Sequence, residues 1–424
     1  MTRKKTLSSI IIWSVISAAF IGPGTVTTAA TAGSLYQLDL LWAVVFATLS
    51  CILLQEVSAR LTIVSGLTMG EALTRKYGGQ KSIWLKFLLG GPVILGCAAY
   101  EAGNILGAVS GLNLLSDINT QLLTLGVTLT SVIILWTGKR SLIGWLMTAL
   151  VGLMGIAFFA LALGRPFSFL TYVHSSFVPV IPAGSELLTL GLVGTTIVPY
   201  NLFLGSGISK GQTIGHMRIG LTISVFIGGL ITAAILIAGT AVGSFSNFSE
   251  LAKALTENLG TLGGLSLGVG LFAAGFSSAI TSPYAASIIA SSVFEWGNRW
   301  QRLVWILVLF TGFVFGISGV RPIPVILAVQ ALNGLVLPLL TAYLILLIND
   351  PVIIPSGHRH SLFYNVVLVL IFGSVLFMGL NNIDKSVSSW MRLSSGHFIV
   401  MLGATFVLTG FLGYRLFSSK KLKQ

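Results

Sequence analysis

The chain has 424 residues, of which 54% are hydrophobic and only 8% are charged, and its formal net charge is +13. Because a soluble domain carries about 25% charged residues, a chain this apolar cannot cover itself with polar side chains, and lipid must be its solvent. Composition thus excludes a soluble fold and predicts one transmembrane domain over residues 1–424.

Windows of about 20 mostly apolar residues, the length that a helix needs to cross a bilayer, occur along the whole chain. In chain order they are 8–31, 41–64, 84–115, 119–137, 142–163, 187–209, 219–243, 262–294, 302–319, 323–348, 361–380 and 396–416. We therefore predict an all-α polytopic membrane protein with about twelve transmembrane helices.

The basic residues give an independent test of this division. With both termini placed in the cytoplasm, eighteen of the 24 Lys and Arg residues fall in inside segments and five in outside segments. Such an excess is what the positive-inside rule requires. The net charge is therefore interpreted as a topology signal. It predicts a multi-pass protein of the cell (inner or plasma) membrane with both termini cytoplasmic, and no nucleic-acid partner.

Two spans are interrupted near their middle. The first contains Gly22-Pro23-Gly24-Thr25 and the sixth contains Val198-Pro199-Tyr200-Asn201. Pro and Gly inside a span release backbone groups that hydrocarbon cannot satisfy, so such breaks lie where they line a cavity or are buried in protein. The two prolines are one five-span unit apart, which is typical of an inverted repeat with its binding site between broken helices. We predict repeat one at 8–163, repeat two at 187–348 and extra helices at 361–416.

Four segments resemble the Nramp (natural resistance-associated macrophage protein) family of divalent metal transporters. They are Leu54–Glu71, Val198–Ser206, Gly275–Thr281 and Gln330–Leu339. The resemblance implies a LeuT-type fold of the APC superfamily, with a 5+5 inverted repeat, discontinuous helices 1 and 6, and alternating access. Members of the family usually move divalent transition metals together with protons.

The chain departs from the family at the metal site that the resemblance implies. The family has Asp-Pro-Gly-Asn in the first span and Met-Pro-His-Asn in the sixth. Here Gly22 replaces the aspartate, Thr25 the amide, Val198 the thioether and Tyr200 the histidine. This divergent site would consist of Gly22, Gly24, Thr25, Thr195, Val198, Tyr200, Asn201, Gln330 and Asn333. It holds no carboxylate, and neutral oxygens alone rarely hold a transition metal.

The missing negative charge guides the substrate hypothesis. Helix N-termini after the breaks carry positive partial charge and free N–H groups, and in LeuT-type carriers they receive a substrate carboxylate. We therefore expect a secondary active transporter for a small organic carboxylate, such as an amino acid or its cyclic relative 5-oxoproline. The alternative is a proton symporter for a divalent metal cation (Mn, Mg or Fe type) with a remodelled site. A pocket for a hydrated ion and a non-transporting receptor are further hypotheses.

Two carboxylates lie well inside the predicted spans, Glu56 and Glu101. Glu101, with Asn104 on the same helix face, resembles the family's pair of acids in the third span, which makes H⁺ the expected coupling ion. The competing interpretation is a carboxyl that merely joins helices. Glu56 is four residues before Arg60, which predicts a structural ion pair.

An alternative coupling ion is Na⁺, held by hydroxyl side chains in the eighth span. Its candidate ligands are Ser277, Ser278 and Thr281, which are equally expected as packing residues between helices. Cys51 and Cys97 lie in apolar segments and are interpreted as small hydrophobic residues. No phosphate-binding loop or catalytic constellation occurs, so we expect no enzyme and no cofactor. The expected partners are the transported solute or ion, the coupling ion and the lipid bilayer.

Overall fold

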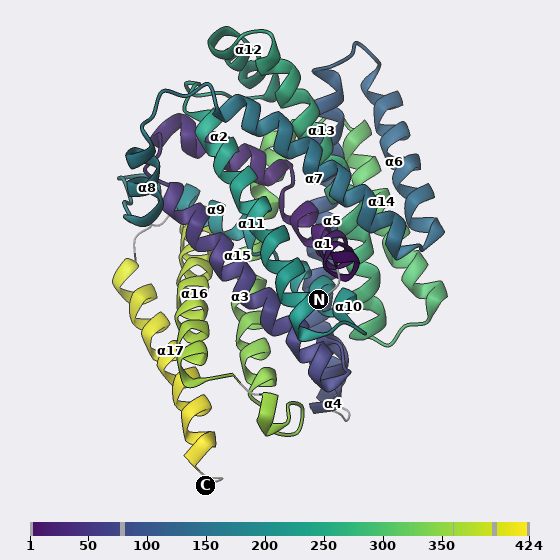
Figure 1. The fold of residues 1–424 in the computed structure, drawn as a ribbon, viewed down its shortest axis with the longest axis vertical. Coiled ribbons are helices and arrows are strands. Elements are labelled where there is room, and N and C mark those ends of the chain that lie inside the picture. Colours follow the sequence, from purple (N-terminus) through teal and green to yellow (C-terminus); the bar gives the residue numbers. More distant parts are fainter. Residues whose placement is uncertain (1–2, 77–80, 359, 392–396, 422–424) are drawn as a thin grey trace.

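The structure, a computed structural model, describes residues 3–76, 81–358, 360–391 and 397–421, and its described residues form helices and connecting loops without strands (Figure 1). The elements are α1 (Arg3–Phe20), α2 (Pro23–Tyr36), α3 (Leu41–Ser65), α4 (Met69–Lys76), α5 (Lys81–Asn113), α6 (Thr120–Thr137), α7 (Arg140–Ala162), α8 (Phe169–Phe177), α9 (Glu186–Thr196), α10 (Pro199–Ser209), α11 (Ile214–Gly239), α12 (Phe248–Leu259), α13 (Leu262–Ser292), α14 (Asn298–Ile317), α15 (Pro322–Ile348), η1 (Ser356–His358), α16 (Leu362–Met391) and α17 (Phe398–Lys421).

The long helices follow the predicted spans closely. Ten of them, among the described residues, are long and apolar enough to cross a membrane, and the bent pair α1 and α2 makes an eleventh. α15 is the twelfth candidate, with an apolar stretch at Val336–Ile348. The protein is therefore an all-α polytopic membrane protein with about twelve transmembrane helices, as the hydropathy predicts.

Both predicted breaks are present. α1 and α2 meet at an angle of 63° across Ile21 and Gly22. α9 ends at Thr196, and α10 begins at Pro199 after Val198 in an extended conformation. Each second half begins with a proline at its first helical position, where the missing N–H leaves no hydrogen bond unmade. Proline therefore sets the point at which each second half-helix starts.

The broken helices lie inside a framework of long helices. α1 packs against α11 and α7, while α9 packs against α2 and α3. α5 runs along α13 and α14, and α10 packs against α3 and α13. α16 and α17 lie side by side at the edge of the bundle, with α16 against α15 (Figure 1). The breaks are consequently enclosed by α5 and α13.

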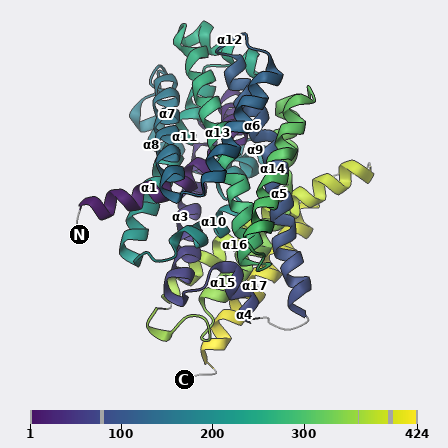
Figure 2. The same cartoon turned by 90° about the vertical axis from the view of Figure 1, so that its right-hand side faces the viewer.

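Three short helices outside the predicted spans are α4, α8 and α12. α12 lies at one end of the bundle and α4 at the opposite end (Figure 2). Each has a polar residue at its start, and in α4 Thr68 and Glu71 cap the helix reciprocally, with Thr68 N donating to Glu71 Oε2 at 2.7 Å. This is the capping box expected from a Thr-x-x-Glu sequence.

A buried carboxylate joins three helices at one end of the bundle. Glu56 Oε1 on α3 accepts from Arg60 at 2.7 Å, which confirms the predicted pair, and from Arg218 Nε on α11 at 2.9 Å. Its Oε2 accepts from the Tyr364 hydroxyl on α16 at 3.1 Å. His360, stacked on Tyr364, places its Nε2 3.7 Å from the same oxygen. The network attaches α16 to the core of the bundle.

Candidate functional site

A small cavity lies where the two helix breaks face each other. Its volume is about 20 Å³, which is enough for one particle the size of a water molecule, since about 10–15 Å³ of such space is required. The residues that line it are Ala19, Phe20, Gly22, Gly24, Thr25, Tyr100, Asn104, Thr195, Val198, Tyr200 and Ser278. They come from both breaks, from α5 and from α13.

The end of α1 explains how the first break is stabilised. The last carbonyls of a helix have no partner within that helix, and here side chains from elsewhere supply it. Ser278 Oγ on α13 donates to Ala18 O at 3.2 Å, and the Tyr200 hydroxyl on α10 donates to Ala19 O at 2.9 Å. Thr25 Oγ1 on α2 donates to Phe20 O at 2.5 Å.

These bonds decide the polarity of the cavity. A hydroxyl has one hydrogen to donate and two lone pairs to accept with, and the hydroxyl hydrogens of Ser278, Tyr200 and Thr25 are all used on carbonyls. Thr195 Oγ1 likewise donates to Leu192 O at 3.1 Å. What these side chains have left to offer is lone pairs. Apart from Tyr100, whose hydroxyl has no partner among the described residues, the polar side chains around the cavity therefore offer acceptors, which suits a cation.

Asn104 completes this acceptor set. Its Nδ2 donates to Glu101 Oε2 at 3.2 Å, which leaves the amide oxygen for the cavity. Because Gly22 has no side chain, the side chains of Ser278 and Asn104 can approach its backbone closely. A Cβ built there would lie 3.7 Å from Asn104 Oδ1 and 3.0 Å from Ser278 Oγ. Ser278 and Asn104 thus occupy the space in front of Gly22.

Glu101 is the acidic group one hydrogen bond away from the cavity. Its side chain is fully buried, and its Oε1 has no partner in the described part of the chain. None of the ion pairs formed by the described residues includes it. An ionised carboxylate without a partner is very costly in such surroundings. Either a proton or a nearby cation is needed to neutralise it.

The hydroxyl residues of the eighth span lie beside the first break. Ser277 Oγ, like Ser278 Oγ, donates to Ala18 O, at 3.1 Å. Thr281 Oγ1 donates back along α13 to Ser277 O at 3.1 Å. Ser277 and Ser278 therefore join α13 to α1, which is the packing role, and their role in holding Na⁺ stays a prediction.

Two aromatic rings separate the small cavity from a larger one. Tyr100 and Tyr200 meet edge to face, with ring centroids 5.7 Å apart. Both rings also line an apolar cavity of about 450 Å³ between α5, α10 and α15. The Tyr100 hydroxyl is buried without a partner among the described residues. The pair forms the wall between the two cavities.

The structure gathers six of the nine binding residues proposed from sequence around the cavity: Gly22, Gly24, Thr25, Thr195, Val198 and Tyr200. Asn201 is buried behind them, and neither polar atom of its side chain has a partner in the described part of the protein. Gln330 and Asn333 are in α15, but their side chains lie outside the described residues. Sequence reasoning missed Tyr100, although its neighbour Glu101 drew attention to this segment.

Groups of three or more His, Cys, Asp or Glu side chains that would suit a metal are absent from the described residues. Cys51 and Cys97 are buried free thiols in separate helices. A cation at the breaks would therefore be held by neutral oxygens, with the carboxyl of Glu101 behind Asn104.

Comparison with known proteins gives consistent sequence matches. The profile of the family described as natural resistance-associated macrophage protein-like matches residues 14–383. A divalent metal cation transporter MntH of Verminephrobacter eiseniae is 26% identical over 403 residues, covering 87% of this chain and 89% of the relative. A protein of the same name from Bacillus subtilis is 26% identical over 302 residues, covering 65% and 68%.

Solved structures support the same fold. A manganese transporter of Eremococcus coleocola superposes with a TM-score of 0.75 at 19% identity, covering 99% of this chain and 95% of the other. MhsT in complex with L-phenylalanine superposes with a TM-score of 0.58 at 16% identity, covering 90% and 98%. The LeuT-type fold expected from sequence is thereby confirmed.

These findings correct the substrate expectation. The sequence hypothesis of a small organic carboxylate is wrong, because the matching relatives are named divalent metal cation transporters. The site gives the physical reason. The hydroxyl hydrogens of Thr25, Tyr200 and Ser278 are used within the protein, so few side-chain donors remain for an anion, and a cavity of about 20 Å³ is smaller than an amino acid.

Proposed function

The chain belongs to the natural resistance-associated macrophage protein-like (Nramp) family, and from that premise we propose that it transports a hard divalent metal cation of the Mg or Mn type. The family is one of membrane transporters rather than enzymes, and its members' substrate is a small ion. The observation that carries the proposal is the wall of lone-pair oxygens around an ion-sized cavity at the facing breaks.

The choice of cation follows from the ligands. Val198 stands where the family has its thioether, and the polar lining consists of hydroxyl, amide and carbonyl oxygens. Oxygen ligands suit hard cations such as Mg²⁺ and Mn²⁺, whereas sulfur and imidazole suit softer ones. We therefore expect discrimination against Cd²⁺. The proposed ligands are Thr25, Asn104, Thr195, Tyr200 and Ser278 with the carbonyls of the first break.

Uptake into proteoliposomes tests this proposal. Purified protein is reconstituted around dyes that respond to Mn²⁺ or Mg²⁺, and the initial rate of entry is measured. We expect uptake of both ions and little competition from Cd²⁺. Absence of uptake for every divalent cation, in protein that is folded and correctly inserted, would refute the proposed function.

Asn104→Leu tests the site itself. The change keeps the size of the side chain and removes the amide oxygen, a loss of one charged contact worth about 1.5–3 kcal/mol. This corresponds to a metal concentration for half-maximal uptake that is about 10- to 100-fold higher. Thr128→Val, which removes a buried hydroxyl on α6, is the matched control and should behave as wild type. Equal metal dependence in the two variants would contradict the assignment.

We further propose that H⁺ is the coupling ion and that Glu101 carries it. The carboxyl next to Asn104 binds a proton, since its Oε1 has no partner in the described part of the chain, and it carries that proton across the membrane together with the cation. Glu101→Gln should bind metal but no longer move protons with it, as read from a pH dye inside the vesicle. Unchanged proton flux would end this role, and loss of transport on replacing Na⁺ by choline would favour Na⁺ coupling instead.

A further inference from the structure

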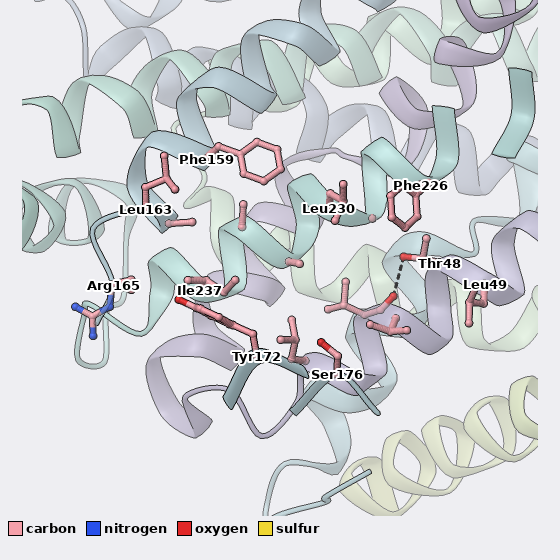
Figure 3. Close-up of a pocket in the computed structure, with 17 residues that line it drawn as sticks. Thr48, Leu49, Phe159, Leu163, Arg165, Tyr172, Ser176, Phe226, Leu230 and Ile237 are labelled. Carbon is pink, nitrogen blue, oxygen red and sulfur yellow. Dashed lines mark hydrogen bonds between the residues drawn. The ribbon is translucent and has the colours of Figure 1, made fainter. Parts of the chain in front are cut away.

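A second site lies away from the helix breaks, on the outer face of the bundle between α3, α7, α8 and α11 (Figure 3). It is a groove of about 460 Å³, within the ~300–1,000 Å³ of sites that hold drug-sized molecules. Phe159 and Leu230 line it, and α3 and α11 touch at its floor, where a Cβ on Gly229 would meet Thr48. Almost the whole lining is hydrocarbon.

One end of the groove carries a positive charge. Arg165 follows α7 by three residues, at the level where α11 ends. Its Nε donates to Thr240 Oγ1 at 2.8 Å and its Nη2 to Thr240 O at 3.0 Å. Among the described residues no carboxylate forms an ion pair with it. A guanidinium has five N–H donors, so three remain for a ligand.

The short helix α8 provides the rest of this end. Tyr172 and Ser176 line the groove, while Phe169, Leu170 and Phe177 on the same helix are exposed. A short helix with exposed aromatic and aliphatic side chains next to the ends of spans is typical of the membrane–water interface. The positive charge and the Tyr172 hydroxyl therefore lie at headgroup depth, and Figure 3 shows Ser176 farther along the groove, with Leu49 and Phe226 at the opposite end.

We propose that this groove binds one anionic phospholipid of the leaflet that faces α8. An acyl chain lies along the apolar lining, and the phosphate receives hydrogen bonds from Arg165 with the Tyr172 hydroxyl beside it. The lining contains no acidic side chain, so neither the transported cation nor a cationic amphiphile fits the charge at this end. The inference is independent of the substrate proposed above.

Native mass spectrometry of the detergent-purified protein tests the proposal. The protein is incubated with equal amounts of dioleoyl phosphatidylglycerol and dioleoyl phosphatidylcholine, and the retained lipids are counted. Wild type should keep one phosphatidylglycerol in preference to phosphatidylcholine. Arg165→Gln should weaken that preference about fivefold, the effect of one basic group near a lipid phosphate. Arg165→Lys, which keeps the charge, should retain most of it.

Ala233→Trp tests the acyl chain separately. Ala233 is a half-buried residue of the groove, and an indole there fills the cavity without changing the charge. We expect this variant to lose the retained lipid, whereas Ala149→Trp, at an exposed position of α7 outside the groove, should keep it. The proposal is overturned if Ala233→Trp keeps the lipid, if Arg165→Gln keeps the full preference, or if inorganic phosphate in excess displaces the lipid.

Discussion

Gly22 shows how a single position is fixed by its neighbours. In the family pattern an aspartate occupies it, and the sequence alone presents only a lost charge. In the structure Ser278 Oγ would lie 3.0 Å from a Cβ at this position, and Asn104 Oδ1 3.7 Å from it. Oxygens from α13 and α5 thus take the place in front of the break that a side chain at residue 22 would fill.

His360 is a second residue whose surroundings decide its chemistry. Burial lowers the pKa of His360 to about 4, and the positive charges of Arg60 and Arg218 act in the same direction, while Glu56 opposes them. Glu56 Oε1 is already bonded to both arginines, so much of its charge is compensated. The imidazole is therefore neutral at physiological pH and stacks on Tyr364 with ring centroids 4.1 Å apart.

This predicts a pH dependence of stability. The unfolded chain binds a proton at His360 below about pH 6.5 and the folded protein only near pH 4. Stability is therefore complete above pH 6.5 and falls as the pH drops toward 4, by about 1–2 kcal/mol at pH 5. His360→Phe, which keeps a stacked ring, should flatten the loss of Tm between pH 7 and 5. The exposed His358→Phe serves as control, and an equal slope in both variants would count against the assignment.

At the scale of elements, close approach of helices sets the position of the first break. A Cβ on Gly107 of α5 would collide with the Pro23 ring at the start of α2. α5 therefore holds the second half of the broken helix directly at its first residue. This contact connects the helix that carries Glu101 and Asn104 with the break that those residues face.

Gly107→Ala should consequently displace α2. We expect a loss of about 1–3 kcal/mol from overpacking and a strong decrease in metal uptake, because the cavity depends on this contact. Gly126→Ala on α6 is the matched control, since a Cβ there meets nothing within 4 Å. It should be neutral or stabilising by up to about 1 kcal/mol, the helix propensity of alanine over glycine. Thermal unfolding and uptake of both variants, measured together, distinguish these outcomes.

The Glu56 network predicts how α16 is held. Glu56→Gln leaves Arg60 buried without its partner, and breaking a buried pair from one side costs about 3–5 kcal/mol. We expect a marked decrease in Tm and faster proteolysis at the loop before α16. Glu295→Gln removes the exposed pair with Lys86 and should change stability by no more than about 0.5 kcal/mol. Similar Tm values for the two variants would disprove the structural role of Glu56.

At the scale of the whole molecule, the prediction with the widest consequence is orientation. The basic residues predict that both termini are cytoplasmic and that α12 lies outside. In a background with Cys51 and Cys97 replaced by alanine, Lys253→Cys should react with a membrane-impermeant maleimide in intact cells. Lys139→Cys should react only after the cells are opened. The reverse pattern would invert the topology.

The division into two repeats and an extra pair of helices stays a prediction at this scale. The boundaries proposed from hydropathy, 8–163, 187–348 and 361–416, coincide with α1–α7, α9–α15 and α16–α17 to within a few residues.

The short helices α4, α8 and α12 were missed, because a search for windows of about 20 apolar residues overlooks segments of eight to twelve. Their capping residues, such as Thr68 with Glu71 and Asn247 with Glu250, were the available signal.

The sequence by itself determined the spans and both breaks. Hydrocarbon requires a minimum length of every spanning helix and tolerates Pro and Gly only where protein or a cavity covers them. Short stretches of sequence are therefore enough to predict these features. The same local reading led to the wrong substrate. It depended on the missing aspartate at residue 22, and it did not include the carbonyl oxygens to which the hydroxyl groups donate.

Only the tertiary structure decided what kind of ligand fits. The bonds from Tyr200 and Ser278 to the carbonyls of residues 18 and 19 join segments separated by 181 and 260 positions. Those bonds use the hydroxyl hydrogens of the two residues and leave their lone pairs beside a cavity of about 20 Å³, an arrangement that favours a small cation over an organic anion. Polarity and volume of a site are properties of contacts between distant segments, and no window of the chain contains them.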